Sequence, residues 1–391
     1  MSEYVQRVKR PIKPIAPRLG QLDIELTERC NNDCIHCCIN RPANDAVARA
    51  GEVTTEQVKD ILQQAVGLGC LQVRFTGGEP LLRPDFEELY LFARRLGLKV
   101  LLFTNGRLIT PHLADLFARI PPLATMEITV YGMHAESYEA VTRAPGSFAQ
   151  FWRGVNLLLA YGVPFVVKSA LLPQNRQEIG EFEAWAKTIP WMDKRPSYSM
   201  FFDLRSRRDS VSKNRQIESL RVSPQDGLAM LTGDEARYRQ EMAEFASKFM
   251  GPPGDQLFDC GAGCGICVDS YGRAQPCMGV RAPELTCGVA GADGHSSLQD
   301  AKDQFCRLRE LRATNPHYLR RCAVCFLKGL CEQCPGKSWV EDGTLDAPVE
   351  YLCDVAHVQA RYLGWLGENE QGWQVIDWRE RIKLLSVNGE R

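Results

Sequence analysis

The spacing of its cysteines constrains this chain more than any other feature. Four cysteines and a histidine fall within residues 30–38, in the sequence CNNDCIHCC. Eleven of the 16 cysteines lie beyond residue 259, in groups that are nearly as dense. So many soft ligands fit a zinc site, a disulfide framework or an iron–sulfur cluster. The fold must therefore bring distant cysteines together.

Disulfides are the least favoured of the three. A chain of 391 residues with 45% hydrophobic residues can bury a core without crosslinks. Residues 1–20 lack the apolar stretch of a secretory signal, and no run of about 18 apolar residues follows. These features predict a cytoplasmic protein, where thiols stay reduced and clustered cysteines more often bind metal. The net charge of −1 indicates neither a nucleic acid nor a membrane partner.

Strand and helix patterns alternate through the first half of the chain. After Thr54, Gln57 stands at capping-box spacing, and an apolar stripe from Val58 to Val66 follows. A second amphipathic helix is predicted over residues 86–96, with Gly97 placed to end it. The alternation predicts a parallel sheet with helices outside it, either a barrel or a doubly wound sheet. The six predicted strands are residues 22–26, 71–76, 99–104, 126–131, 164–170 and 197–202.

Unusual residues follow every one of these strands. The cysteine cluster follows the first strand, GGEP the second and TNG the third. The fourth closes in TVYG, Asn175 follows the fifth, and the sixth runs toward Arg205. Ligands bind at the carboxyl ends of parallel strands in such folds. Six segments therefore predict one active site.

The N-terminal cluster has the spacing C-x3-C-x2-C, formed by Cys30, Cys34 and Cys37. Three thiolates on one loop leave a fourth metal position open, whereas a structural zinc site normally has four closed ligands. Cys38 or His36 could supply the fourth ligand, so the spacing leaves both metals possible.

CNNDCIHC, followed after the next strand by GGEP, resembles the radical S-adenosylmethionine (radical SAM) superfamily over about residues 22–203. The resemblance implies a partial (β/α)6 barrel with a [4Fe–4S] cluster on Cys30, Cys34 and Cys37. The cluster would bind S-adenosylmethionine, whose reductive cleavage gives a 5′-deoxyadenosyl radical that abstracts a substrate hydrogen. Tyr131 stands where relatives often have aspartate, so no ribose contact is carried over to it. The implied cofactor-binding residues are His36, Gly77, Gly78, Glu79, Asn105, Thr129, Lys168 and Asn175.

Within this set the expected roles differ. His36 is expected against the adenine, and the glycines are expected to let the backbone approach the methionine amino group. Glu79 offers that amino group an acceptor. Asn105 and Thr129 are placed for polar contacts to the ribose or the carboxylate.

The second half carries two further cysteine runs. Alone, the C-x2-C-x5-C-x2-C run would suggest a four-thiolate zinc module. Because they follow a predicted radical SAM barrel in the sequence, these runs resemble the SPASM extension, which holds two auxiliary [4Fe–4S] clusters. The spacing between Cys331 and Cys334 is one residue shorter than in relatives, so Cys334 departs from the family pattern of cluster ligands. The resemblance implies one cluster on Cys260, Cys277, Cys334 and either Cys264 or Cys267, and another on Cys322, Cys325, Cys331 and Cys353.

The predicted class is α/β, a partial (β/α)6 barrel with a C-terminal cysteine-rich, loop-rich iron–sulfur domain. The polar, basic stretch 204–221 is interpreted as a solvated connector, with a lid or anion-binding strip as the alternative. The predicted units are an N-terminal extension (1–20), the barrel (21–225), a bridging helix and linker (226–258), the auxiliary-cluster domain (259–365) and a tail (366–391).

We expect an enzyme with three [4Fe–4S] clusters and S-adenosylmethionine that crosslinks, epimerises or oxidises a peptide or protein. The alternative is a small-molecule enzyme of tetrapyrrole, quinone or sugar biosynthesis. About twenty residues before the first strand are too few for a leader-binding domain. Leader recognition would then fall to a separate protein or to Arg205, Arg207, Arg208 and Lys213. A flavodoxin or ferredoxin would supply electrons. No catalytic side chain is assigned, with Tyr131 and a spare cysteine as candidates.

Overall fold

The computed structural model describes residues 18–258, 260 and 263–388. Residues 1–17 of the predicted extension and 389–391 of the predicted tail lie outside this part. The strands are β1 (Gln21–Thr27), β2 (Arg29–Cys30), β3 (Arg41–Pro42), β4 (Gln72–Gly77), β5 (Lys99–Thr104), β6 (Met126–Val130), β7 (Phe165–Ala170), β8 (Ser197–Ser199), β9 (Gly265–Val268), β10 (Arg273–Gln275) and β11 (Cys287–Gly288).

Helices cover the sheet in the first half and dominate the second half. The helices of the first half are α2 (Ala46–Gly51), α3 (Thr55–Gly67), α4 (Phe86–Arg95), α5 (Pro111–Arg119), α6 (Ala135–Thr142), α7 (Ser147–Ala160) and α8 (Ile179–Ala186). Those of the second half are α9 (Val211–Leu220), α10 (Pro224–Leu231), α11 (Glu235–Phe249), α12 (Leu298–Cys306), α13 (Pro316–Arg320), α14 (Lys328–Cys331), α15 (Pro335–Asp342), α16 (Glu350–Tyr362) and α17 (Trp378–Asn388). No described helix is both long and apolar enough to cross a bilayer.

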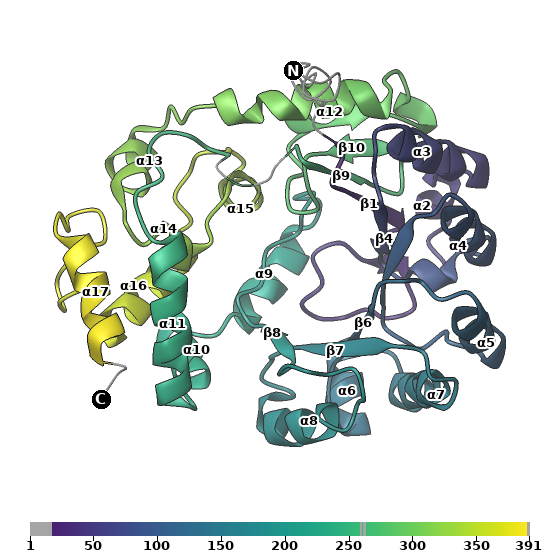
Figure 1. Cartoon of the computed structure of the whole chain (residues 1–391), viewed down its shortest axis with the longest axis horizontal. Coiled ribbons are helices and arrows are strands. Elements are labelled where there is room, and N and C mark those ends of the chain that lie inside the picture. Colours follow the sequence, from purple (N-terminus) through teal and green to yellow (C-terminus); the bar gives the residue numbers. More distant parts are fainter. Residues whose placement is uncertain (1–17, 259, 261–262, 389–391) are drawn as a thin grey trace, which may run out of the picture.

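A nine-stranded sheet in the order β11-β10-β9-β1-β4-β5-β6-β7-β8 forms the centre of the barrel. All neighbours from β1 to β8 are parallel, which confirms the predicted α/β class. Figure 1 shows the sheet curving, with α3 to α8 on its outer side. Leu22 and Ile24 of β1 and Val73 and Phe75 of β4 are buried in the shared core.

Local signals placed the outer helices correctly. At α3, Thr54 Oγ1 accepts from Gln57 N, and Gln57 Oε1 accepts from Thr54 N, which is the predicted capping box. The same helix buries the predicted apolar stripe against the sheet. Gly97 has φ +83° just beyond α4, as expected of a residue that ends a helix.

The first C-terminal cysteine run returns to the barrel sheet. β9 pairs in parallel with β1, with Leu22 opposite Ile266, and β10 and β11 continue the sheet in antiparallel fashion. The turn between β9 and β10 is built on Asp269, a fully buried carboxylate that accepts from the backbone N–H groups of Tyr271 and Arg273 at 3.0 Å. Barrel and auxiliary region therefore share one sheet.

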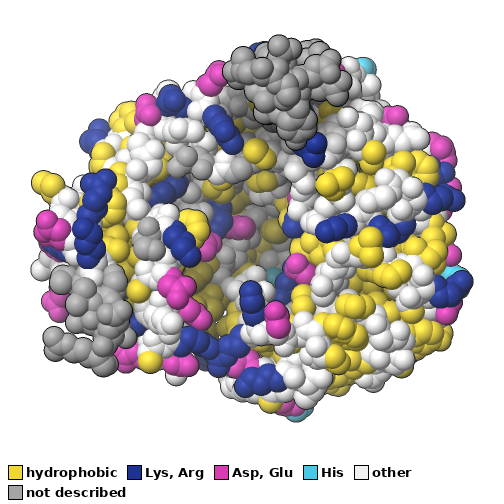
Figure 2. All heavy atoms as spheres, viewed as in Figure 1, with side chains coloured by type: hydrophobic (Ala, Val, Ile, Leu, Met, Phe, Trp, Pro, Cys, Tyr) yellow, Lys and Arg dark blue, Asp and Glu magenta, His cyan; other side chains and the backbone are white. Residues whose placement is uncertain are grey.

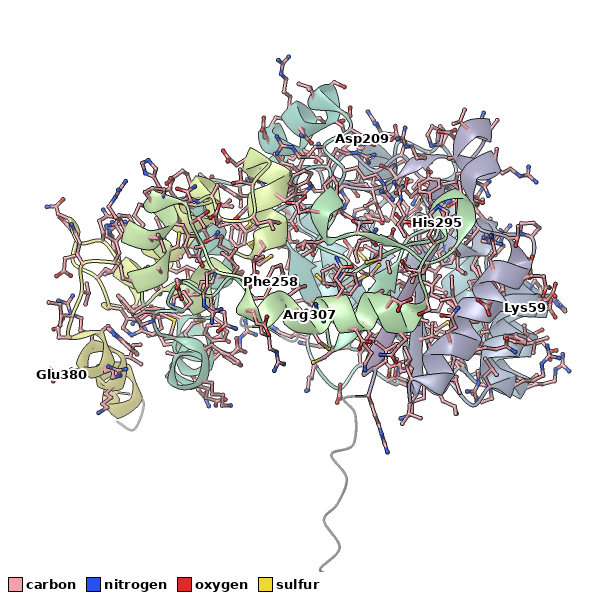
Figure 3. The ribbon with its side chains drawn as sticks, turned by 90° about the horizontal axis from the view of Figure 1, so that it is seen from above. Lys59, Asp209, Phe258, His295, Arg307 and Glu380 are labelled. Carbon is pink, nitrogen blue, oxygen red and sulfur yellow. The ribbon has the colours of Figure 1, made fainter. Side chains whose placement is uncertain are left out.

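The C-terminal helices have a hydrophobic core of their own. Phe326 and Trp365 are fully buried in it, and Tyr238 and Ala246 of α11 pack into the same cluster. The bridging helix thus belongs to the C-terminal half of the molecule. Lys59 on α3 and Glu380 on α17 mark the two ends of the long axis (Figure 3).

The interpretation of residues 204–221 as a solvated connector is wrong. Arg205 is buried and donates to Asp209 Oδ1 at 2.9 Å. Arg207 joins Glu28 at 2.6 Å and Asp269 at 2.8 Å. Acidic partners from distant segments therefore neutralise charges that look solvated in the local sequence.

The same stretch also contains a helix that was not predicted. α9 buries Ile217 and Leu220. Arg208 donates to carbonyls of α15, and Lys213 donates to the Cys34 carbonyl at 2.9 Å. The four cations considered for leader recognition are therefore all engaged in internal contacts.

Candidate active site

A cavity of about 410 Å³ lies at the carboxyl ends of the parallel strands. It is lined by residues that follow or end β1, β4, β5, β6, β7 and β8, so these strand ends meet as predicted. Figure 2 shows the molecular face hollowed between the barrel and the C-terminal half. The predicted site residues in its lining are Cys30, Cys34, Cys37, His36, Gly77, Gly78, Asn105, Thr129 and Lys168.

Four thiols of the N-terminal loop line this cavity, those of Cys30, Cys34 and Cys37 and that of Cys38. Cys34 is buried, and Cys30 Sγ accepts from Asn32 N at 3.4 Å. Burial and the neighbouring Cys37 raise the pKa of Cys34 to about 12, and burial with Cys34 raises that of Cys30 well above its usual value. A bound cation reverses this balance, because it stabilises thiolates directly. The loop therefore fits a [4Fe–4S] cluster with three thiolate ligands and one position open to the cavity.

Among the described residues, no three His, Cys, Asp or Glu side chains lie close enough to hold a single metal ion. In a [4Fe–4S] cubane each cysteine binds a different iron, so the thiolates lie farther apart than those around one ion.

Arg107 holds the cysteine loop in place, and sequence reasoning missed it. Its buried guanidinium donates to Asn31 O, Asn32 Oδ1 and Gln150 Oε1. Asn105 Nδ2 donates to Asn31 Oδ1 at 2.7 Å, which adds a second tie from the same turn. The only local signal was the position of Arg107 directly after TNG.

The two glycines of the GGEP turn are required by a close approach of backbone to backbone. Gly77 has φ +127°, and a Cβ there would lie 2.1 Å from Thr27 O. A Cβ on Gly78 would lie 2.2 Å from Arg29 O. These contacts are with the end of β1 and with β2, and the predicted approach of the glycines to a ligand stays a prediction. The turn is thereby packed against the start of the cysteine loop.

Glu79 is fully buried beneath the cavity rather than in its lining. Its Oε1 accepts from Thr104 Oγ1 and its Oε2 from Asn105 N, both at 2.8 Å. Burial raises its pKa to about 7. In the structure, this carboxylate ties the second turn of the site to the third.

His36 forms an aromatic wall with two neighbours. Its ring centroid lies 5.0 Å from that of Phe202 and 5.8 Å from that of Tyr131. Burial lowers its pKa to about 4, and its buried Nδ1 has no hydrogen-bond partner within the described part of the chain. A neutral ring with one unsatisfied nitrogen suits a heteroaromatic ligand.

Lys168 and Asn175 occupy different places. Lys168 Nζ pairs with Glu127 at 2.7 Å and lines the cavity. Asn175 lies outside it, and its Nδ2 donates to the carbonyls of Tyr131 and Ala170 at 2.9 and 2.8 Å. Asn175 therefore joins the ends of β6 and β7.

Four C-terminal cysteines converge on a second, much smaller cavity of about 20 Å³. These are Cys322, Cys325, Cys331 and Cys353, the set assigned to one auxiliary cluster. Burial and the nearby thiols raise the pKa of Cys325 and Cys353 to about 12 and that of Cys322 to about 11. As in the barrel, bound iron would offset this cost of ionisation.

Cys260, Cys277 and Cys334 form a third group. Burial raises the pKa of Cys277, and the neighbouring Cys334 and Cys260 raise it further. The fourth ligand of this set stays a prediction. Cys267 is fully buried, and its Sγ lies 3.8 Å from Nη2 of Arg281. Cys264 is exposed, and its Sγ lies 3.7 Å from Nη2 of Arg309.

Comparison with known proteins identifies the family. The model of the Radical SAM superfamily matches residues 24–186. The AdoMet-dependent heme synthase of Methanosarcina barkeri is 27% identical over 84% of this chain and 94% of that protein. The mycofactocin maturase MftC of Mycolicibacterium smegmatis is 30% identical, over 77% of this chain and 74% of that protein. The structure of native anSMEcpe with bound AdoMet and Cp18Cys peptide has the same fold, with a TM-score of 0.59 and 16% identity over 95% of this chain and 100% of that one. The chain therefore belongs to the radical SAM superfamily and is a radical SAM enzyme.

Proposed function

We propose that this radical SAM enzyme modifies a peptide or protein and that S-adenosylmethionine is cleaved in the 410 Å³ cavity. When bound, the cluster and S-adenosylmethionine supply a reductive cleavage that gives a 5′-deoxyadenosyl radical. The observation that carries the proposal is the meeting of three cysteine thiols with six strand ends around one cavity. The names of the maturase MftC and of the anSMEcpe peptide complex support a peptide substrate.

In this proposal the residues around the cavity have separate binding roles. Cys30, Cys34 and Cys37 hold the cluster, and His36 with its aromatic neighbours receives the adenine. Gly77 and Gly78 form the floor, and their carbonyl groups, Asn105, Thr129 and Lys168 supply polar contacts. Glu79 acts from below by fixing the Asn105 turn, because its oxygens already accept hydrogen bonds there.

We assign two auxiliary [4Fe–4S] clusters to a SPASM-like region at about residues 259–365. The convergence of Cys322, Cys325, Cys331 and Cys353 supports the first. The proximity of Cys260, Cys277 and Cys334 supports the second, with Cys264 or Cys267 as its fourth ligand. The division into extension, barrel, bridging segment, auxiliary domain and tail is part of the same proposal. A flavodoxin or ferredoxin is the proposed electron donor, and a separate protein would present any leader sequence.

A small-molecule substrate is the second candidate. The heme synthase of M. barkeri is covered over 94% of its length, which favours a tetrapyrrole as the alternative.

The test is anaerobic reconstitution followed by measurement of iron, sulfide and zinc. Three clusters would give about twelve irons per chain. Dithionite and S-adenosylmethionine should then yield 5′-deoxyadenosine, which liquid chromatography measures, and the Cys34→Ala variant is the control. About four irons with one or two zincs would contradict the auxiliary clusters, because the C-terminal cysteines would then form a zinc module. Turnover of a short peptide encoded beside this gene, compared with turnover of tetrapyrroles, separates the two substrate classes.

A further inference from the structure

A second chamber of about 600 Å³ adjoins the first cavity. The two share Ser199, Phe201 and Asp203, which follow or end β8. Beyond these residues the chamber is bounded by α10, α11 and the segment around Cys331. The chamber and the first cavity therefore meet at these three residues.

Much of the chamber wall is apolar and adaptable. Met200, Met230 and Met242 line it together with Phe201 and Phe245. Methionine side chains are flexible and polarizable, so they fit ligands of varied shape. Such a lining suits the side chains of a peptide better than one rigid ring system.

The charges in the wall are matched, with one exception. Arg195 pairs with Glu183 at 2.9 Å, Arg237 with Glu241 at 3.6 Å, and Lys337 with Glu332 at 3.5 Å. The remaining charged residue in the lining is Asp203. No hydrogen bond or ion pair to its carboxylate occurs within residues 18–258, 260 and 263–388.

Asp203 is exposed to solvent, and the nearest cations make their ion pairs with other carboxylates. Desolvation by the surrounding residues raises its pKa, and the charges that act on it are those of Lys337, Arg221, Glu341 and Glu332. Lys337 already faces Glu332, and Arg221 already pairs with Glu341. Lys337 and Arg221 thus act favourably on Asp203 as well, although each makes its ion pair with another carboxylate. A ligand that brings a positive charge to this point would balance Asp203.

One strand edge also borders the chamber. β8 ends the sheet, and the Ser199 carbonyl accepts from Leu171 N at 2.8 Å on the β7 side. Successive residues of a strand present their backbone groups to opposite sides, so Tyr198 and Met200 present theirs to the free edge. Both residues line the chamber. Extended peptides commonly bind by adding a strand to such an edge.

We propose that this chamber binds an extended segment of the peptide substrate along β8 and that Asp203 pairs with a lysine or arginine side chain of that segment. The inference rests on the proposed peptide substrate and makes it specific: the segment entering the chamber is basic at one position.

The experiment uses reconstituted full-length enzyme under anaerobic conditions. Octapeptide pools are offered that have one central position fixed as lysine, arginine, norleucine or glutamate and the others randomised. Bound peptides are recovered by rapid gel filtration and counted by mass spectrometry. The lysine and arginine pools should be enriched about threefold over norleucine, as expected for an ion pair at a solvent-accessible carboxylate.

Two variants locate the effect. Asp203→Asn should abolish the preference for basic residues and leave norleucine binding unchanged, whereas Asp203→Glu should retain it. Glu241→Gln is the matched control, since it removes a paired carboxylate from the same wall and should keep the preference. Equal enrichment of all pools, no enrichment of any pool, or an unchanged preference in Asp203→Asn would overturn the inference.

Affinity for S-adenosylmethionine and formation of 5′-deoxyadenosine are measured on the same samples. If Asp203→Asn weakens S-adenosylmethionine binding, the carboxylate serves the cofactor, and this inference fails while the radical chemistry stands. If the wild-type enzyme forms no 5′-deoxyadenosine, the proposed function fails whatever the peptides do.

Discussion

The two best-defined cysteine sites have the same ligand chemistry and different surroundings. In both, burial and neighbouring thiols raise thiol pKa values to about 12. The barrel site has three cysteines of a predicted ligand set beside a cavity of about 410 Å³. The C-terminal site has four such cysteines around a cavity of about 20 Å³. Metal sites that keep an open position act on ligands, whereas closed sites serve structure or electron transfer. Under the proposed function, this difference in space separates a reactive site from a closed one.

The two sites also differ in what supports them. The barrel site lies on strand ends above a large core that includes Leu22 and Phe75. The C-terminal site lies on short elements such as α14 and on α16, with a smaller core behind them. Small loop-rich regions often depend on metal to fold. The barrel should therefore tolerate loss of its cluster better than the C-terminal region does.

The largest expected effect is at the open site. Cys34→Ala should lower reductive cleavage of S-adenosylmethionine by at least about a thousandfold, because the cluster that delivers the electron loses a ligand. The rate of 5′-deoxyadenosine formation measures this. Cleavage within about tenfold of wild type would show that the barrel loop does not hold the reactive cluster.

At the closed site, the same substitution should affect stability first. Cys325→Ala should lower the melting temperature of the C-terminal region by about 10 °C, since metal binding and folding are coupled. Cleavage of S-adenosylmethionine should stay within about tenfold of wild type. Scanning calorimetry tests this, with Cys287→Ser as control because Cys287 lies outside every predicted ligand set. An unchanged melting temperature would remove the contrast in support between the two sites.

The junction between the two regions should be sensitive to Asp269. Burial would raise its pKa, but Arg207 and Arg273 outweigh burial and hold the pKa below its usual value. Asp269→Asn removes the carboxylate that Arg207 and Arg273 share, leaves Arg207 with Glu28 alone, and should cost about 3 kcal/mol of unfolding free energy. A group with a depressed pKa stabilises the fold above its unfolded pKa, so this contribution is lost as the pH falls below about 4.

Urea unfolding at pH 7 measures the cost, and thermal scans from pH 7 downward follow the pH dependence. Arg94→Gln, on the outer helix α4, is the control. If Asp269→Asn unfolds like wild type, the two halves are not coupled through this carboxylate.

The smallest effect is expected at the aromatic wall of the open site. His36→Phe keeps a ring against Phe202 and Tyr131, so the dissociation constant for S-adenosylmethionine should change by no more than about threefold. His36→Ala removes the ring and should weaken binding about tenfold. Equilibrium dialysis measures both. Loss of affinity in the phenylalanine variant would assign the contact to the imidazole nitrogen instead.

Local patterns predicted the parts of the fold whose causes are local. The capping box of Thr54 and Gln57 placed α3, and five of the six predicted strands match β1, β4, β5, β6 and β7 to within about a residue or two. β8 is shorter than predicted, because its ladder with β7 extends only to Ser199. The helix α12 was missed although Ser297 and Asp300 form a capping box in the sequence.

Contacts between distant segments were not predictable in this way. Nothing near Arg207 indicates that Glu28 and Asp269 will face it. The cysteine positions at the open cavity could be read from spacing, but Arg107 depends on the folded course of the cysteine loop. Asp203 is an ordinary residue in the sequence, and only the pairing of all its neighbours makes it distinctive.

The pairing of β9 with β1 has a consequence for the topology of the enzyme. A partial barrel has two open margins, and unpaired strands at such margins invite aggregation. Here β9 of the auxiliary region pairs with β1 and covers that margin, while the sheet ends at its other margin in the short strand β8. A barrel expressed alone as residues 21–225 would lack β9, expose the edge of β1 and self-associate. The margin at β8 ends in residues that line the cavity, whereas the margin at β1 is covered by the C-terminal half.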